Sequence, residues 1–181
     1  MLSEEIKTLR SMSIRDAIRQ TVALGLVVSS ALIVWKIMMV VANAESPIVV
    51  VLSGSMEPGY HRGDLLLLNL WSEPIQVGDI CVYRLEGKDI PIVHRVHRVH
   101  ENKKGDLFIL TKGDNNPGDD RGLYNPGQEW IGPRHLMGRS KAYLPNVGML
   151  TIWITETYWL RYVVVGILGF FVLSGKENSR Y

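Results

Sequence analysis

An apolar stretch of 22 residues, Thr21–Ala42, constrains most strongly what this chain can fold into. As an α-helix it would rise about 33 Å, which is enough to cross the hydrocarbon core of a bilayer. Its polar members are Ser29, Ser30 and Lys36, and Lys36 lies near the C-terminal end, where a long side chain can reach the interface. We therefore predict a transmembrane signal anchor at residues 21–42.

The charges around this stretch predict its orientation. Under the positive-inside rule, the basic residues that precede it place residues 1–20 in the cytosol and the rest of the chain on the lumenal side. The alternative is a cleavable signal peptide, because Ala42-Asn43-Ala44 fits the small-x-small pattern of a cleavage site. The long apolar stretch and the long polar leader favour the retained anchor. The preceding basic residues are Lys7, Arg10, Arg15 and Arg19.

A second apolar stretch, Val163–Leu173, lies near the C-terminus. As a helix its 11 residues would rise about 16 Å, roughly half the thickness of a normal bilayer. We expect a short hydrophobic helix at 161–175, followed by a polar tail at 176–181. A core helix, an interfacial helix and a helix that crosses thinned membrane all remain open.

The intervening residues 43–160 are predicted to form one mainly β domain. Turn signals such as Pro58-Gly59 and Glu86-Gly87 separate apolar, β-branched runs at regular intervals between residues 46 and 143. This spacing is typical of a compact antiparallel sheet or partial barrel. The predicted strands are Ile48–Leu52, Asp64–Leu70, Asp79–Leu85, Pro91–His100 and Leu107–Lys112.

The composition of the chain gives no support for a nucleic-acid-binding, nucleotide-binding or disulfide-bonded protein. A net charge of +2 gives no reason to expect nucleic acid as a partner, and no Gly-rich phosphate loop occurs. The single cysteine, Cys81, cannot form an intramolecular disulfide, and its apolar neighbours predict a buried thiol.

The segment Ser53-Gly54-Ser55-Met56-Glu57-Pro58 is the first candidate for catalytic chemistry. It follows an apolar strand and precedes a Pro-Gly turn, so a serine there would be rigidly held and exposed, as a nucleophile requires. One hydroxyl could attack a carbonyl while the other, or a backbone N–H beside it, donates to the oxyanion. Serines in turns are usually only turn residues, so this segment alone does not establish catalysis.

Three histidines, His94, His97 and His100, form the second candidate. On a regular strand, His94 and His100 share one face and His97 lies on the other, so the three cannot converge on one metal ion. A single neutral imidazole that acts as a general base is the more plausible role, whereas the others are expected to be solvated strand residues.

The acidic, turn-rich segment 110–122 is the third candidate. Its aspartates could cap local backbone, and a calcium site is conceivable, although the spacing does not match an EF-hand. One aspartate could instead orient a histidine, as in a Ser/His/Asp triad. The sequence leaves open which aspartate does so, among Asp114, Asp119 and Asp120.

Five short blocks occur in order along the chain and together resemble one family. They are Ser-Gly-Ser-Met-Glu-Pro at 53–58, Arg-Gly-Asp-Leu at 62–65, Ile-Pro-Ile-Val-His-Arg-Val at 90–96, Lys-Gly-Asp-Asn at 112–115 and Asp-Asp-Arg-Gly at 119–122. This set resembles the catalytic subunits of the eukaryotic endoplasmic reticulum signal peptidase complex, the Sec11 type of the signal peptidase I family. The likeness extends over nearly the whole chain, including the anchor and the tail.

The resemblance implies a role for individual residues. Ser55 matches the nucleophile, and Ser53 matches a hydroxyl of the oxyanion hole. His94 matches the general base, at the position where bacterial relatives have a lysine. Asp120 matches the third catalytic residue, and Asp114 matches a supporting acidic position.

The resemblance also implies a β catalytic core on an N-terminal anchor, in a single-pass type II protein of the endoplasmic reticulum membrane. The activity would be that of a serine endopeptidase that removes signal peptides from secretory and membrane pre-proteins, with no metal and no organic cofactor. Accessory subunits of the complex and the lipid bilayer would be its partners, besides those pre-proteins.

Two other functions are alternatives to a Ser/His/Asp signal peptidase. A membrane-anchored scaffold subunit would keep the fold without catalysis. A Ser/Lys peptidase would use Lys104 or Lys112 as the base, although neither lysine lies where the bacterial pattern places it.

Overall fold

The computed structural model describes residues 13–71, 74–103 and 105–174. The chain divides into two compact units, residues 1–41 and 42–181, and each is described by itself. Residues 1–12 of the predicted cytosolic segment 1–20 lie outside the described residues, as do the predicted tail 176–181 and the lysine at position 104.

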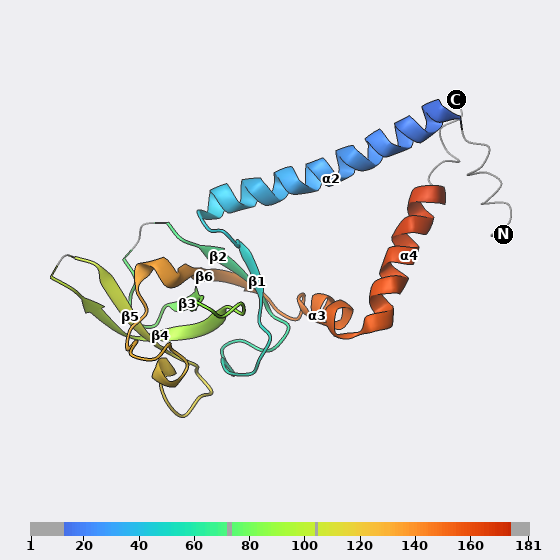
Figure 1. Ribbon diagram of the computed structural model, residues 1–181. Coiled ribbons are helices and arrows are strands. Elements are labelled where there is room, and N and C mark those ends of the chain that lie inside the picture. Colours follow the sequence, from blue (N-terminus) through green and yellow to red (C-terminus); the bar gives the residue numbers. More distant parts are fainter. Residues whose placement is uncertain (1–12, 72–73, 104, 175–181) are drawn as a thin grey trace. The chain divides into compact units, whose positions relative to one another are not determined.

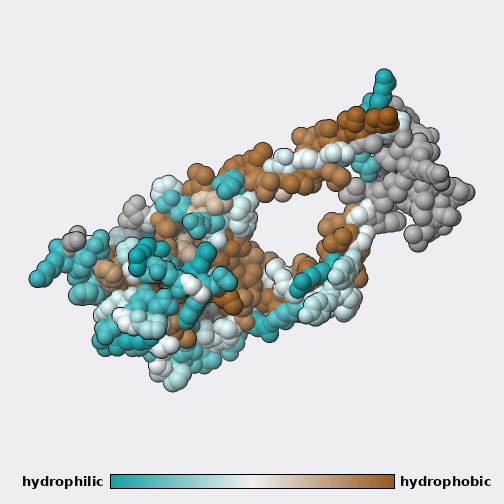
Figure 2. Space-filling view, in the orientation of Figure 1, coloured by the Kyte–Doolittle hydropathy of each residue, from teal (hydrophilic) through white to brown (hydrophobic). Residues whose placement is uncertain are grey.

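The first unit is dominated by one long helix, α2 (Ile14–Ala42). Among the described residues, its part Ile18–Ala42 is the one helix that is long and apolar enough to cross a membrane. Figure 2 shows the apolar surface that runs along this helix. The helix ends at the residue predicted for the end of the span and begins seven residues before the predicted start.

The second unit is built on a six-stranded antiparallel sheet that curves into a half-barrel (Figure 1). The order of the strands is β1-β2-β6-β3-β4-β5. This sheet confirms the predicted fold class, a mainly β domain with an apolar helix on either side in the sequence. The strands are β1 (Ile48–Val50), β2 (Leu65–Asn69), β3 (Ile80–Tyr83), β4 (Ile92–Glu101), β5 (Leu107–Lys112) and β6 (Leu136–Leu144).

Strand β6 is the one strand that the sequence analysis did not predict. It lies between β2 and β3, although Gly138, Arg139, Ser140 and Lys141 make its sequence polar. Gly138 has a packing role, because a Cβ atom there would lie 3.0 Å from the Cβ of Leu68. Buried strands tolerate polar residues when those residues are paired, and a hydrophobicity pattern does not detect such strands.

A β-bulge changes the expected arrangement of the histidines on β4. The register with β5 shifts between Val96 and Arg98, so that Val96 lies opposite Thr111 and Val99 lies opposite Ile109. Val96 and Val99 therefore point to the same face, although they are three residues apart. The prediction that His94 and His100 share a face is wrong, because the bulge at His97 reverses the alternation beyond it.

Two apolar clusters pack against the sheet, and at β3 they lie on opposite faces, because Cys81 belongs to one and the adjacent Val82 to the other. The larger one joins β3, β4 and β5, and it includes Cys81, which is fully buried as predicted. The smaller one joins the end of β1 to β2, β3 and β6. The members of the larger cluster are Cys81, Tyr83, Leu85, Val96, Ile109, Leu110, Tyr124 and Ile131, and those of the smaller one are Val51, Leu66, Leu68, Val82 and Met137.

Two helices follow β6, namely α3 (Met149–Glu156), which the sequence analysis did not predict, and α4 (Tyr158–Ser174). Helix α3 buries Ile152, and its Glu156 forms an ion pair with Arg62. Its other side exposes Leu150 and Trp153, and α4 is apolar and largely exposed over the part whose side chains are described.

Candidate active site

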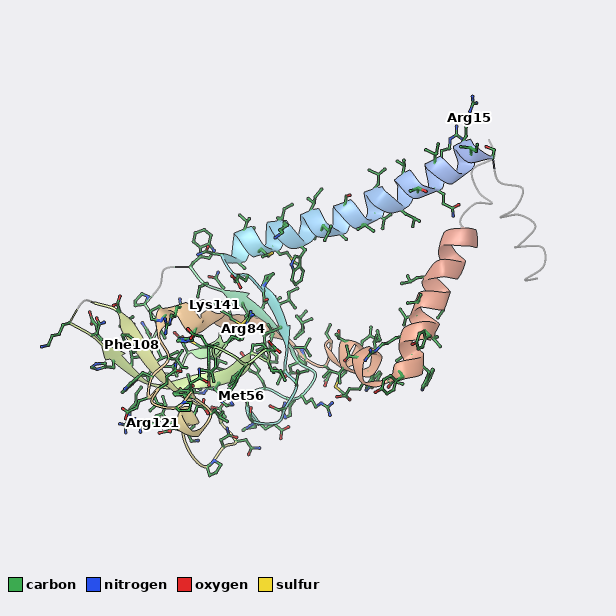
Figure 3. The ribbon with its side chains drawn as sticks, in the orientation of Figure 1. Arg15, Met56, Arg84, Phe108, Arg121 and Lys141 are labelled. Atoms are coloured by element: carbon green, nitrogen blue, oxygen red, sulfur yellow. The ribbon has the colours of Figure 1, made fainter. Side chains whose placement is uncertain are left out.

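The segment that carries the two candidate serines is held at both of its ends. Before it, the Val51 N–H donates to the carbonyl of Asp64 (2.9 Å), and the Gly63 N–H donates to the carbonyl of Val51 (2.8 Å). After it, Met56 has no exposed surface and anchors the turn in the protein interior. Figure 3 labels Met56, which marks this turn. Ser55 is thus fixed between a strand end and a buried anchor.

The structure brings Ser55, His94 and Asp120 into one hydrogen-bonded chain. His94 Nε2 lies 3.0 Å from Ser55 Oγ, and His94 Nδ1 lies 2.5 Å from Asp120 Oδ2. His94 is 3% exposed and Asp120 is 1% exposed. Asp120 begins a one-turn 3₁₀ helix, η1 (Asp120–Gly122), after β5. These contacts have the geometry of an activated serine, in which the base is itself oriented by a carboxylate.

Ser53 and Asn115 lie next to this chain of hydrogen bonds. Ser53 Oγ is 3.2 Å from Ser55 Oγ, within reach of an oxyanion that forms beside the nucleophile. The Asn115 N–H donates to the carbonyl of Ser55 (2.9 Å), and its side-chain amide donates to the carbonyl of Gly54 (3.1 Å). The loop after β5 therefore holds the backbone of the nucleophile in place, a role that the sequence analysis missed.

The three aspartates left open by the sequence have different partners. Asp114 binds Arg95 in a bidentate ion pair (2.8 and 2.7 Å), and the hydrogen bonds from Arg95 hold the pKa of this carboxyl below its usual value. Asp119 caps η1 by accepting from the backbone N–H of Arg121. Only Asp120 of the three is hydrogen-bonded to His94.

Asp120 is also the centre of a buried hydroxyl cluster that no sequence pattern indicated. Its Oδ2 accepts from Thr111 Oγ1 (2.7 Å) and from the hydroxyl of Tyr83 (3.1 Å). Burial by itself raises the pKa of Asp120, but the hydrogen bonds from His94 and Thr111 outweigh it, so the pKa lies below its usual value. The carboxyl is therefore ionised at neutral pH.

None of the remaining candidates that the structure describes is hydrogen-bonded to the serine. Lys112 Nζ donates to the carbonyl of Gly113, and His97 is exposed on β4. His100 stacks against Trp130 with ring centroids 5.5 Å apart. Among the described residues, no group of three or more His, Cys, Asp or Glu side chains is arranged to hold a metal ion.

Comparison with known proteins identifies the family. The Peptidase S24-like family model matches residues 21–119. The chain is 50% identical over 171 residues to the signal peptidase complex catalytic subunit SEC11C of Rattus norvegicus, covering 94% of this chain and 89% of the relative. This chain belongs to the signal peptidase complex catalytic subunit family.

Members from distant eukaryotes match the chain equally well. The signal peptidase complex catalytic subunit sec11 of Dictyostelium discoideum is 52% identical over 159 residues, covering 88% of this chain and 89% of the relative. The subunit SEC11 of Debaryomyces hansenii is 49% identical over 167 residues, covering 92% of this chain and all of the relative. These matches confirm the family resemblance inferred from the five blocks.

Gly113 offers a sharp test of site geometry in this signal peptidase family member. A Cβ atom there would lie 2.7 Å from the carbonyl oxygen of Ser55 and 2.9 Å from His94 Nε2. Gly113→Ala must therefore separate the serine from the base, and we expect peptidase activity to fall about 100-fold or more, since misplacement by 1 Å costs that much. Gly118→Ala is the matched control, because a Cβ at Gly118 has no atom within 4 Å. Equal activity of the two variants would contradict the geometry.

Proposed function

We propose that this chain is a membrane-bound serine endopeptidase that cleaves signal peptides from secretory and membrane pre-proteins, as the catalytic subunit of a signal peptidase complex at the endoplasmic reticulum. The observation that carries the proposal is the Ser55–His94–Asp120 chain of hydrogen bonds in a member of this family. The scaffold alternative lacks such support, because it gives no reason to keep a base and a carboxylate aligned on a serine.

The proposed reaction is acyl transfer to Ser55. Neutral His94 takes the hydroxyl proton at Nε2 while Ser55 Oγ attacks the carbonyl carbon of the scissile bond. The oxyanion is stabilised by Ser53 and nearby N–H groups, and the charged His94, oriented by Asp120, then protonates the leaving amine. Water, deprotonated by His94, hydrolyses the acyl-enzyme and releases the signal peptide. No step of this mechanism needs a metal or an organic cofactor.

Ser53 provides a prediction for the oxyanion step. Because the hydroxyl proton of Ser55 is directed to His94, Ser53 donates to Ser55 Oγ across 3.2 Å and can turn to the oxyanion. We expect Ser53→Ala to lower kcat for pre-protein cleavage by about 10²-fold with little change in KM, as for the loss of one oxyanion donor. Ser53→Thr, which keeps the hydroxyl, should retain most of the activity. A raised KM with unchanged kcat would assign Ser53 to substrate binding instead.

We further propose that residues 1–20 are cytosolic, 21–42 form a retained anchor and 43–160 form the lumenal protease domain. Retention is supported by the contacts of the alternative cleavage site. The Leu70 N–H donates to the carbonyl of Ala42 (2.9 Å), the Asn43 amide donates to the carbonyl of Leu70, and Ala44 is 6% exposed. Cleavage after Ala44 would need this backbone to give up its hydrogen bonds with Leu70.

Pre-proteins, accessory subunits and the lipid bilayer are the proposed partners. The exposed apolar side chains of α3 and α4 need cover from lipid or from another subunit, since large exposed apolar patches mark such interfaces. The short hydrophobic helix proposed at 161–175 falls within α4, up to the last described residue.

The test of the proposed function is cleavage of a model pre-protein in membranes that lack the endogenous enzyme. Supplying this chain should restore cleavage, and mass spectrometry should locate the new N-terminus after a small residue. The matched control is the same pre-protein with a bulky residue before the cleavage point, which should stay uncut. Failure to restore cleavage, with the chain incorporated into the complex, would overturn the proposal.

A further inference from the structure

Three hydroxyl groups from three different elements surround the buried side of Asp120. Tyr83 lies on β3, Thr111 on β5 and Tyr124 just after η1, and they are 0%, 0% and 6% exposed. Thr111 Oγ1 lies 2.7 Å from Asp120 Oδ2, 2.9 Å from the Tyr124 hydroxyl and 3.1 Å from the Tyr83 hydroxyl. The mechanism proposed above uses none of these groups.

The protons of this cluster can be assigned one by one. The backbone N–H of Thr111 donates to the Tyr124 oxygen (3.1 Å), so the hydroxyl of Tyr124 is free to donate to Thr111 Oγ1. The single hydroxyl proton of Thr111 has two acceptors in reach, Asp120 Oδ2 at 2.7 Å and the Tyr83 oxygen at 3.1 Å, and we assign it to the closer and charged one. Tyr83 donates to the same carboxylate oxygen. Tyr83 and Thr111 thus donate their hydroxyl protons directly to the carboxylate, and Tyr124 donates to Thr111. The carboxylate of Asp120 acts only as an acceptor.

The tyrosines cannot reverse this direction by ionising. Burial, as the largest effect, raises the pKa of Tyr83 and of Tyr124 above the usual value for a phenol, so both keep their protons. An acceptor-only Asp120 requires His94 to carry its proton on Nδ1, since that nitrogen lies 2.5 Å from Oδ2. Nε2 is then unprotonated and faces the Ser55 hydroxyl, as a general base must.

We propose that Thr111 is a positioning residue whose hydroxyl, ordered by Tyr124 and assisted by Tyr83, fixes Asp120 as an acceptor and thereby selects the reactive tautomer of His94. This inference rests on the proposed function, because it assigns a role to groups that act through the base. Four buried side chains then orient His94 in place of Asp120 alone, and we call them the relay. They are Asp120, Thr111, Tyr83 and Tyr124.

The groups that face His94 from neighbouring elements bear on its protonation. Cys81 lies opposite His94 on β3, and burial raises the pKa of its thiol to about 12, so it is uncharged. Asp114 is ionised but paired with Arg95. The groups around His94 are therefore Ser55, Tyr83, Cys81, Thr111, Asp114 with Arg95, Asp120 and Tyr124.

The decisive variant is Thr111→Val, which removes the hydroxyl but keeps the branched shape and the backbone donor to Tyr124. We expect kcat for pre-protein cleavage to fall about 10- to 100-fold, part of the 10²–10⁴ that a general base contributes, with KM nearly unchanged. A carboxylate that has lost a donor attracts the imidazolium proton more strongly. The acid limb of the pH–rate profile should therefore move to higher pH.

Matched variants separate positioning from packing. Thr111→Ser keeps the hydroxyl and should restore both the rate and the wild-type pH profile. Tyr60→Phe is the control for loss of a partly buried hydroxyl elsewhere, because Tyr60 bonds Ser140 and not the cluster, and it should leave the profile unchanged. If Thr111→Val keeps wild-type kcat, or if Thr111→Ser fails to rescue and no profile shifts, the inference is overturned.

Two further variants keep the test decisive. If Thr111→Val does not accumulate, Tyr83→Phe replaces it, since this variant also removes one donor from Asp120 Oδ2. A shifted acid limb in Tyr83→Phe supports the relay, and an unmoved one overturns it. Ser55→Ala distinguishes a failure of the positioning role from a failure of the proposed function. If it is inactive while Thr111→Val is normal, only the relay fails; if it is fully active, the proposed function fails.

Discussion

Replacing Ser55 by alanine is expected to lower pre-protein cleavage by about 10⁴-fold or more, because no other described hydroxyl both lies 3.0 Å from His94 Nε2 and occupies the turn that Met56 anchors. The loss should appear in kcat rather than in KM, since the hydroxyl acts in the chemical step. Single-turnover cleavage in membranes that lack the endogenous enzyme measures it directly.

Two controls show whether the loss of activity in Ser55→Ala is catalytic: its assembly into the complex, and the activity of His94→Ala. The Ser55→Ala subunit should still be recovered in the complex, because Ser55 is only partly buried and its carbonyl still accepts from the Asn115 N–H. His94→Ala should be as inactive as Ser55→Ala, and the double variant should be no worse than either, as expected for groups that act as a unit. Normal cleavage by Ser55→Ala would favour the scaffold alternative, whereas activity of His94→Ala would favour a lysine base.

Asp120→Asn is expected to lower kcat by about 10⁴-fold while the site stays in place. The amide that replaces the carboxylate can donate to His94 Nδ1, which moves the imidazole proton to Nε2, where it blocks acceptance of the Ser55 proton. The effect is chemical rather than steric, because the two side chains have nearly the same shape. Measurement of kcat and of thermal stability in parallel separates the two kinds of effect.

The neighbouring aspartates are the controls for this prediction. Asp119→Asn should cost little, because its partner Arg121 is a surface group and the remaining amide oxygen can still cap η1. Figure 3 labels Arg121, which marks this loop. Asp114→Asn weakens the bidentate pair with Arg95 and should have an intermediate effect. If Asp120→Asn alone stays active, the orienting role belongs to Asp114 or Asp119 and the assignment of Ser55 and His94 survives.

Much of the fold could be predicted because most strands carry their signal locally. β-branched runs between Gly and Pro turns indicated β1 to β5 within a few residues of the observed bounds. β6 could not be predicted in this way, because its central position depends on Gly138 fitting under Leu68 and on Arg139 binding Asp79 (3.1 Å), contacts that arise only in the folded sheet. The bulge at His97 is likewise set by pairing with β5 and not by local sequence.

The candidate site was predictable only in part for the same reason. The residues alone indicated a serine, a histidine and one of three aspartates, and the family resemblance was needed to choose among them. Thr111, Tyr83 and Tyr124 carried no signal, because isolated hydroxyls in strands and loops are common, and their role follows from convergence on Asp120. The Thr111 and Tyr83 variants described above test this positioning role.

The place of β6 in the sheet has a consequence for biosynthesis. β2 and β3 follow each other in the chain, yet they are joined only through β6, the last strand to be made. Before residues 136–144 emerge, the nucleophile belongs to a β1–β2 hairpin, whereas the base and its carboxylate belong to a separate β3–β4–β5 meander. Within the described sheet, β6 is the strand that pairs with both halves, since it bonds to β2 on one side and to β3 on the other. We therefore expect a ribosome-bound fragment that ends before β6 to lack peptidase activity.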